Sequence, residues 1–207
     1  MPFLSVPFTN TKQQKPYWCW AAVAANVYNS MRPASVAIES QCDVAKLVEG
    51  PHACDSAEGN LDALSSALAD LGINDQLATR PRIVVVENEF EGITNQLNPV
   101  TNENGVAEPV CAEIMFPGPA FHFVAISAID TDNQHVWIAD PYLGGNSVEF
   151  SFQDFVNNYN YTSPDATAPV PGAGIVQNLQ RVVNKWQATS KPEGKHATSN
   201  DNPGNAG

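Results

Sequence analysis

The sequence predicts an α+β fold, in which a helical first half is followed by an antiparallel β-sheet. Between residues 19 and 71 apolar side chains recur at helical spacing, whereas short β-branched and aromatic runs separated by Pro, Gly, Asp and Asn dominate residues 110 to 183. The chain has 207 residues, of which 43% are hydrophobic and 15% are charged. This length and composition allow one compact unit with its own core.

Three helices are expected in the first half of the chain. The stretch from Cys19 to Ser30 is apolar almost all round, which indicates a helix buried in the middle of the protein, and Pro33 ends it. A second helix is expected from Ser35 to Val48. A third is expected from Glu58 to Leu71, where leucines recur at helical spacing and Gly72 supplies a C-cap.

The β-branched run Ile83–Val86 marks the change from helices to strands. The segment from Gln153 to Tyr159 is expected to form a short helix after the main strands. The strands expected in the sheet are Val110–Phe116, Phe121–Ile129, His135–Ala139, Val148–Phe152 and Gly174–Val183.

Residues 1–186 are predicted to form a single domain. Beyond about Gln187 the chain loses its apolar residues and fills with Ser, Asn, Gly, Lys and Pro. Burial in such a segment cannot repay the entropy that ordering would cost. Residues 187–207 are therefore predicted to be a disordered C-terminal tail.

The formal net charge of -12 argues against nucleic acid or an anionic membrane as a partner, because both require an excess of Lys and Arg. No apolar run is long enough to span a bilayer, so membrane insertion is not expected. The segment Met1–Asn10 lacks a basic stretch followed by an apolar one, so no signal peptide is visible. The four cysteines lack CxxC spacing, so no metal site is expected.

Cys19 is the strongest chemical candidate in the first half, because it lies in the first turn of an apolar helix. The positive end of the helix dipole stabilises a thiolate, and the unpaired N–H groups of the first turn can receive an oxyanion. The alternative is a buried, inert cysteine, which is common on apolar helices.

His122 and Asp140 are the matching candidates in the second half. His122 begins one expected strand and Asp140 follows the end of the next, so a hairpin across residues 130–134 would bring them side by side. The chain order Cys, His, Asp then supplies a nucleophile, its base and the group that orients the base. His122 could instead be a core histidine with satisfied hydrogen bonds, and Asp140 could be a turn residue before Pro141.

The remaining histidines and aspartates fit these roles less well. His52, His135 and His196 are more simply explained as surface residues. Asp130 and Asp132 belong to the loop between the two expected strands.

In its motifs the chain resembles bacterial papain-like cysteine peptidases of the C39-like or effector type. Gln13 precedes Cys19 by six positions in a Tyr-Trp-Cys-Trp-Ala-Ala context, and the His-Phe-Val and Ala-Asp-Pro segments follow in order. The resemblance implies a papain-like fold, with a helical lobe that carries the nucleophile packed on an antiparallel sheet lobe. It implies a peptidase that hydrolyses a peptide or protein through a Cys-His-Asp triad and a thioester, without a cofactor.

The resemblance also implies an oxyanion donor. Gln13 would donate its side-chain amide beside the backbone N–H of Cys19, with Gln14 as the rival. Asp140 is expected to accept from Nδ1 of His122, which would leave Nε2 facing the thiol. Relatives often carry Gly before the histidine, whereas here Ala120 and the bulky Phe121 precede it. This departure alters the shape expected for the substrate cleft.

Aromatic residues beside the triad are candidates for substrate binding. Trp18 and Trp20 flank Cys19, where core packing is at least as good an explanation as a substrate wall, and Phe121 precedes His122.

The remaining cysteines have structural interpretations. Cys42 and Cys54 are close enough to close a disulfide loop worth roughly 3 kcal/mol. Similar bacterial domains often carry cysteines at these positions, which favours a bridge if the protein works outside the cytosol. Cys111 is expected to be a buried hydrophobic residue.

Two other functions use the same residues. The triad could transfer the acyl group to an amine or alcohol, as transglutaminase-like enzymes and acyltransferases do. The domain could also be a catalytically silent peptide-binding module. We expect a monomer, and secretion or delivery as an effector is favoured over a place in the cytoplasm, which the sequence does not determine.

Overall fold

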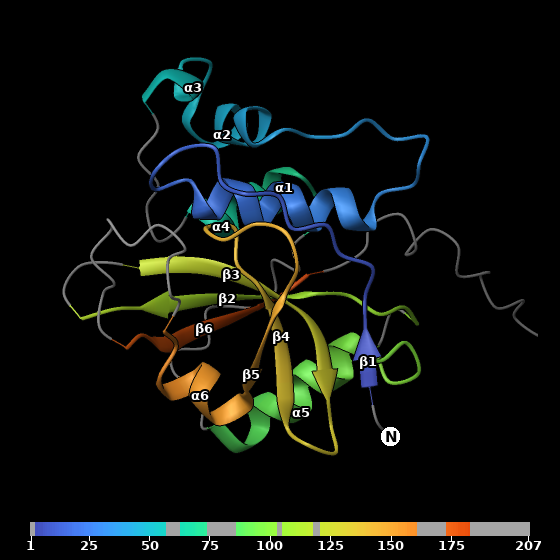
Figure 1. Cartoon of the computed structure of the whole chain (residues 1–207). Helices are drawn as coiled ribbons and strands as arrows, with labels where there is room; N and C mark the ends of the chain where they lie inside the picture. Colours follow the sequence, from blue (N-terminus) through green and yellow to red (C-terminus); the bar gives the residue numbers. More distant parts are fainter. Residues whose placement is uncertain are drawn as a thin grey trace, which may run out of the picture.

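A six-stranded antiparallel sheet forms the centre of the protein (Figure 1). The computed structural model describes residues 3–56, 63–73, 86–102, 105–117, 121–160 and 173–182. The strand order is β5-β4-β3-β2-β6, and β1 pairs with the part of β3 that lies beyond the end of β2. The strands are β1 (Phe3–Ser5), β2 (Val110–Met115), β3 (Phe121–Asp130), β4 (His135–Ala139), β5 (Val148–Ser151) and β6 (Ile175–Arg181).

Helices cover both faces of this sheet. Helix α1 packs on β3 and is itself covered by α2 and α4, while α5 and α6 lie on the opposite face (Figure 1). The helices are α1 (Cys19–Met31), α2 (Gln41–Glu49), α3 (Ala53–Ser56), α4 (Ala63–Asp70), α5 (Val86–Leu97) and α6 (Phe152–Asn157). The α+β prediction, with a helical layer packed on an antiparallel sheet, is confirmed.

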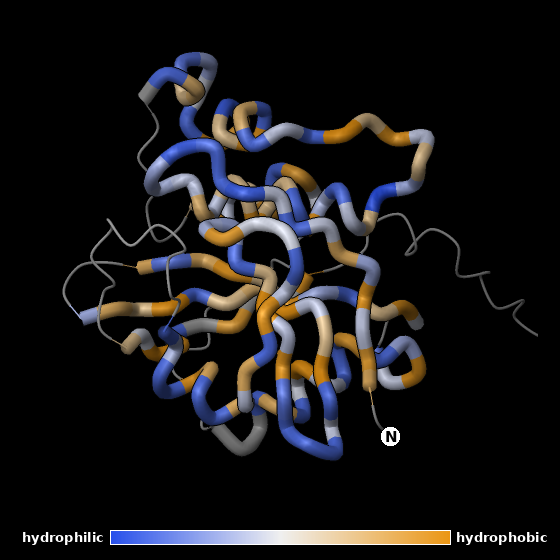
Figure 2. The backbone as a smooth tube through the Cα atoms, viewed as in Figure 1, coloured by the Kyte–Doolittle hydropathy of each residue, from blue (hydrophilic) through white to orange (hydrophobic). Residues whose placement is uncertain are grey.

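Two hydrophobic cores sandwich the sheet, because successive side chains of a strand point to opposite faces. Phe123 and Ala125 of β3 pack toward α1, and Val124 and Ile126 pack toward α5 and α6. Figure 2 shows the apolar residues gathered along the strands of this layer, whereas the β3–β4 turn is hydrophilic. Strand β3 is therefore buried from residue 122 to residue 129.

The buried position of α1 follows from its composition. All ten residues from Cys19 to Tyr28 are buried, and four of them are alanines. Small side chains let the helix approach the sheet closely on one side and α4 on the other. None of the helices among the described residues is long and apolar enough to cross a membrane.

The first half of the chain departs from the sequence predictions in its helix boundaries. Helix α2 begins at Gln41, not at Ser35, because Ser40 forms a capping box with Asp43. The predicted third helix is observed as α4, and its first residues, from Glu58, lie outside the described residues.

Helix α5 and strand β1 were not predicted. The expected strand Ile83–Val86 is wrong at Val86, which begins α5, and its other residues lie outside those described. Ile93 and Leu97 bury one side of α5 against the sheet. This burial against tertiary partners outweighs the local β preference of the valine. Strand β1 has only three residues and no periodic pattern to reveal it.

The hairpin between β3 and β4 is confirmed. Its register pairs Ala125 with Ala139 and Asp130 with His135, with an irregularity between Ile126 and Ala128. Asp140, the residue after β4, is therefore brought to the same end of the hairpin as His122, near the start of β3.

Strand β6 completes the sheet through its pairing with β2. Gly174, just before β6, exchanges two backbone hydrogen bonds of 2.8 Å with Tyr159. Val182, just after it, is fully buried. The tail predicted for residues 187–207 lies outside the described residues.

Replacing Gly174 tests this packing. A Cβ at Gly174 would lie 2.6 Å from Cγ2 of Ile114 and 2.8 Å from Cε1 of Phe116, two buried side chains. Overpacking of this kind costs about 1–3 kcal/mol. Gly174→Ala should therefore lower the free energy of unfolding by that amount in a denaturant titration.

Gly92 on α5 is the matched control, because an added Cβ there meets no atom within 4 Å. Gly92→Ala should be neutral or slightly stabilising. Equal unfolding free energies for Gly174→Ala and wild type would show that β6 does not pack tightly on β2.

Candidate active site

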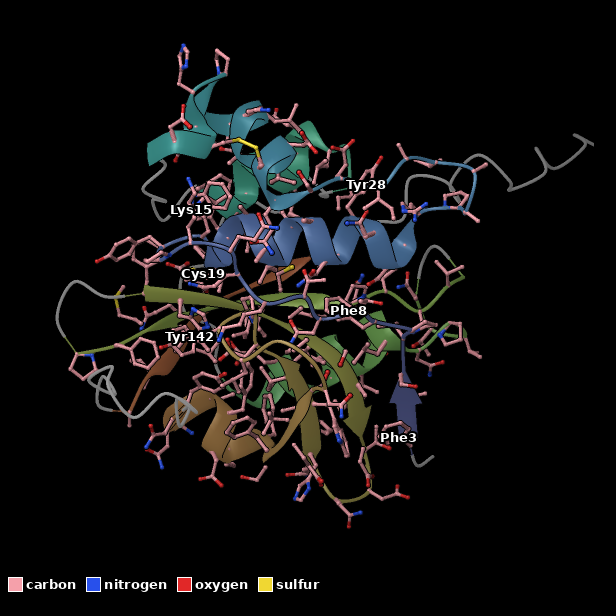
Figure 3. The ribbon with its side chains drawn as sticks, turned by 45° about the horizontal axis from the view of Figure 1, so that its top comes forward. Phe3, Phe8, Lys15, Cys19, Tyr28 and Tyr142 are labelled. Carbon is pink, nitrogen blue, oxygen red and sulfur yellow. A yellow bond between two sulfur atoms is a disulfide. The ribbon has the colours of Figure 1, made fainter. Side chains whose placement is uncertain are left out.

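Cys19 begins α1 and lies beside the sheet (Figure 3). Trp18 is the N-cap, and its side chain makes no capping hydrogen bond. The chain enters the helix through Tyr17, whose φ of 67° is unusual for a residue other than glycine. Cys19, a residue 4% exposed, therefore lies at the positive end of a helix whose first N–H groups lack a side-chain cap.

His122 and Asp140 form a buried hydrogen-bonded pair. His122 Nε2 lies 2.7 Å from Asp140 Oδ1, and the two residues are 7% and 1% exposed. The His122 side chain also hydrogen-bonds Cys19. Since Nε2 contacts the carboxylate, Nδ1 is the ring nitrogen left for the thiol.

The two ring nitrogens have the opposite roles to those expected from the sequence. The β3–β4 register places Asp140 next to the Ala125–Ala139 pair, beyond His122 along β3. The carboxylate is therefore reached by Nε2, the ring nitrogen farther from the backbone. The expected pairing of Asp140 with Nδ1 is wrong.

The electrostatics of the pair favour an imidazolium beside a carboxylate. Burial by itself lowers the pKa of His122, but the Asp140 carboxylate and the contacts with Cys19 outweigh it and raise this pKa to about 10. For Asp140, burial by itself raises the pKa. The positive charge of His122, with hydrogen bonds from His122, Tyr159 and the Tyr142 N–H, outweighs burial and holds the pKa of Asp140 below its usual value.

Both oxygens of the Asp140 carboxylate are occupied. Oδ1 also accepts from the Tyr142 N–H at 2.7 Å, and Oδ2 accepts from the Tyr159 hydroxyl at 2.7 Å. The Asp140 carbonyl meanwhile accepts from the N–H groups of Leu143 and Gly144. The structure thus shows the contacts of both roles weighed from the sequence, since the Asp140 backbone forms a turn and its side chain hydrogen-bonds His122.

Gln13 lies on the loop that enters Cys19. Its backbone N–H donates to the Pro141 carbonyl at 2.7 Å, and its side-chain Nε2 donates to the Lys15 carbonyl at 3.0 Å. Among the described residues, the second N–H of the Gln13 amide has no acceptor. Gln14, by contrast, has an exposed side chain.

Gln41, the first residue of α2, clamps this loop. Its buried side chain accepts from the Gln14 N–H at 2.8 Å and donates to the Lys12 carbonyl at 2.9 Å. The backbone is held on both sides of Gln13, which fixes the direction of the Gln13 side chain.

Two buried asparagines tie the same loop to both lobes. Asn10 Nδ2 donates to the Asp140 carbonyl at 2.9 Å. Asn26 of α1 donates to the Thr11 carbonyl at 3.2 Å and accepts from the Thr11 N–H at 3.3 Å. Helix α1 and the turn after β4 are thus connected through one segment of backbone.

The aromatic residues proposed for substrate binding differ in exposure. Trp18 and Trp20 are both fully buried, so they pack in the core and offer no wall to a substrate. Phe121 is half-buried, with its ring centroid 5.6 Å from that of Phe123. Tyr17, which the sequence analysis did not select, is 71% exposed and lies two residues before Cys19.

The cysteines other than Cys19 are structural. A disulfide joins Cys42 of α2 to Cys54 of α3 and is visible as the yellow bond in Figure 3. Cys111 is fully buried, and burial raises the pKa of its thiol to about 12. Cys111 is therefore a poor nucleophile at neutral pH.

The rejected candidates that the structure describes lie in the surface positions expected for them. His135 contacts Glu149 at 2.6 Å on the exposed edge of the sheet, and His52 lies in an exposed turn. Asp130 accepts hydrogen bonds from Asp132 and Asn133 within the hairpin turn. His196 lies outside the described residues, among which no cluster of His, Cys, Asp and Glu could hold a metal ion.

Tyr159, Gln41, Asn10 and Asn26 were missed by the sequence analysis. Each is an ordinary polar residue of a loop or helix, and each acts through a partner at least 15 positions away. No local pattern marks such residues.

A cysteine at the start of a central helix, hydrogen-bonded to a histidine–aspartate pair on an antiparallel sheet, is the arrangement of papain-like cysteine peptidases. The model of the Peptidase_C39 like family matches residues 3–167. The chain belongs to this family, which supports a peptidase, and thus a hydrolase, at the level of the family. A search of curated proteins gives no match.

The His122–Asp140 pair predicts a pH dependence of stability. The pKa of His122 rises from its ordinary value of 6.5 to about 10 on folding, so its pairing stabilises the folded protein fully below pH 6.5. This stabilisation is lost as the pH rises through about 10. The pKa of Asp140 is lowered on folding, so its stabilisation of the folded protein is present at neutral pH and is lost as the pH falls into the acidic range.

The measurement compares the unfolding free energies of wild type and His122→Gln between pH 6 and pH 10.5, since the difference isolates His122 from other titrating groups. We expect the advantage of wild type to shrink steadily across this range. A constant difference would contradict the raised pKa.

Proposed function

We propose that this protein is a cysteine peptidase that hydrolyses peptide bonds through Cys19, His122 and Asp140. The single observation that carries the proposal is the buried chain of contacts from thiol to imidazole to carboxylate. A structural cysteine needs no such base, and a core histidine needs no charged orienter.

In the proposed reaction, the Cys19 thiolate attacks the carbonyl carbon of the scissile peptide bond. As the C–N bond breaks, the His122 imidazolium gives the proton on Nδ1 to the leaving amine, and the acyl group remains as a thioester on Cys19. Water then attacks the thioester while Nδ1 accepts its proton. The carboxylic acid product leaves and the thiolate–imidazolium pair is restored.

The negative charge on the carbonyl oxygen needs donors at both attacks. The uncapped N–H groups at the start of α1 and the free N–H of the Gln13 amide are the donors we assign to it. Gln13 is favoured over Gln14 because its side chain is partly buried and its backbone is bonded to Pro141, beside the triad.

The proposed substrate is a peptide or protein segment, and it is proposed to bind beside Phe121. The protein is proposed to act as a monomer. The Cys42–Cys54 disulfide supports a place of action outside the cytosol, because disulfides persist in oxidising compartments. Secretion or delivery as an effector satisfies that condition.

Loss of either reacting group should abolish turnover. Cys19→Ala removes the nucleophile and His122→Ala removes its base. When catalytic residues act as a unit, replacing any one of them removes nearly all of the enzyme's activity. Cleavage of a diverse peptide library, followed by mass spectrometry, measures this for wild type and both variants. Thermal unfolding checks that each variant is folded.

Retention of a tenth of wild-type cleavage by Cys19→Ala would exclude the thioester route. The same library with an added primary amine distinguishes hydrolysis from acyl transfer, because an acyltransferase would yield the amide product. A silent binding domain would give no cleavage with wild type.

The two glutamines are tested against one another. Gln13→Ala should lower kcat by about 10²–10³-fold, as loss of one oxyanion donor does in other hydrolases. Gln14→Ala is the matched control, since it keeps the backbone N–H that Gln41 holds and removes only an exposed side chain. A loss of kcat in Gln14→Ala with none in Gln13→Ala would reverse the assignment.

A further inference from the structure

Tyr159 makes a contact that the triad itself does not require. Its hydroxyl donates to Asp140 Oδ2 at 2.7 Å, and the residue is 1% exposed. His122 and the Tyr142 N–H both use Oδ1, so Tyr159 supplies the one side-chain or backbone contact recorded for Oδ2 among the described residues.

We propose that Tyr159 is a positioning residue of this active site, which locks the Asp140 carboxylate in the orientation that holds His122 toward Cys19. The inference rests on the proposed function and adds a fourth side chain to the chain of contacts. In this role Tyr159 acts on His122 through Asp140.

The position of the Tyr159 hydroxyl is fixed by two kinds of contact. Its ring packs against those of Phe150 and Phe155, with centroids 5.2 and 5.9 Å away. Its backbone exchanges two hydrogen bonds with Gly174. The hydroxyl therefore reaches Asp140 from a rigid junction between α6 and β6, and little entropy is lost in making the bond.

The residues that hold Tyr159 in place include Gly174. Gly174 lies beyond the segment matched by the family model, which ends at residue 167. The bridge between Tyr159 and Gly174 joins the last described residues of the matched segment to β6. The sheet edge formed by β6 thus contributes to the site through Tyr159.

The hydroxyl has two physical effects on Asp140. It satisfies an oxygen that would otherwise be buried without a donor, so the carboxylate cannot turn about its own axis without loss. It also draws negative charge toward Oδ2, away from His122. The groups that face Asp140 are His122 from β3, the Tyr142 N–H from the turn and Tyr159, two residues after the end of α6, with Cys19 behind His122.

Tyr159→Phe removes the donor and keeps the ring. We expect kcat to fall roughly tenfold with little change in KM, since a hydrogen bond to a charged group is lost from the reacting assembly and not from the substrate contacts. The charge freed from Oδ2 then strengthens the hold of Asp140 on the imidazolium proton. The upper limb of the profile of kcat/KM against pH should therefore move to higher pH.

Asp140→Asn gives the opposite shift, because it removes the charge that stabilises the imidazolium. Asn can still accept from Nε2 through its side-chain carbonyl, so this variant should keep part of the activity with its upper limb at lower pH. Tyr159→Phe and Asp140→Asn should thus shift the upper limb of the pH profile in opposite directions. A general loss of stability would not produce such opposite shifts.

Tyr28→Phe is the matched control. Tyr28 is buried in the helical core on α1, away from Asp140, and the substitution removes the same hydroxyl. It should leave the pH profile unchanged even if it lowers the melting temperature.

A second measurement needs no substrate. Titration of the His122 ring signals by NMR, in wild type, Tyr159→Phe and Tyr28→Phe, reports the pKa of His122 directly. We expect a higher pKa in Tyr159→Phe alone.

An unchanged His122 titration in Tyr159→Phe would overturn the positioning role whether or not a peptide substrate is cleaved. Absence of Cys19-dependent cleavage in wild type, with the NMR shift present, would instead overturn the proposed function and leave Tyr159 as the group that sets the state of Asp140.

Discussion

The 2.7 Å hydrogen bond between His122 Nε2 and Asp140 Oδ1 is the constraint on which the other parts of the site depend. Placing a charged pair in a buried site is costly unless both members are fully hydrogen-bonded. The fold meets this condition with the Tyr142 N–H and the Tyr159 hydroxyl on the carboxylate, and with Cys19 on the imidazole. These contacts favour an imidazolium beside the start of α1, where a thiolate is the complementary charge.

A second constraint is that the two halves of the site come from separate layers of the fold. Cys19 belongs to the helical layer, and His122 and Asp140 belong to the sheet. The loop before Cys19 joins them, because Gln41 and Asn26 hold it to the helices while Asn10 holds it to the Asp140 carbonyl. The disulfide begins one residue after Gln41, so the start of α2 is covalently tied to α3 at the point where the clamp begins.

The sequence was sufficient to predict the fold class, the β3–β4 hairpin and the residues that meet in the site, because each has a local signature such as a cysteine in a helix's first turn. It could not predict which ring nitrogen of His122 faces Asp140, since that depends on strand register to within one residue. Tyr159 and Gln41 were equally hidden, with partners 19 and 27 positions away. At Val86 a β-branched pattern was misleading, because burial of Ile93 and Leu97 against the sheet favours helix α5.

The central claim is that His122 activates Cys19, and the rate of alkylation by iodoacetamide at neutral pH tests it most directly. Cys111 is the internal control, because it is also a free and buried cysteine but lacks such a base among the described residues. In wild type we expect Cys19 to be alkylated much faster than Cys111. In His122→Ala we expect the alkylation rate of Cys19 to be at least roughly tenfold lower than in wild type. Equal alkylation rates of Cys19 in the two proteins would contradict the account.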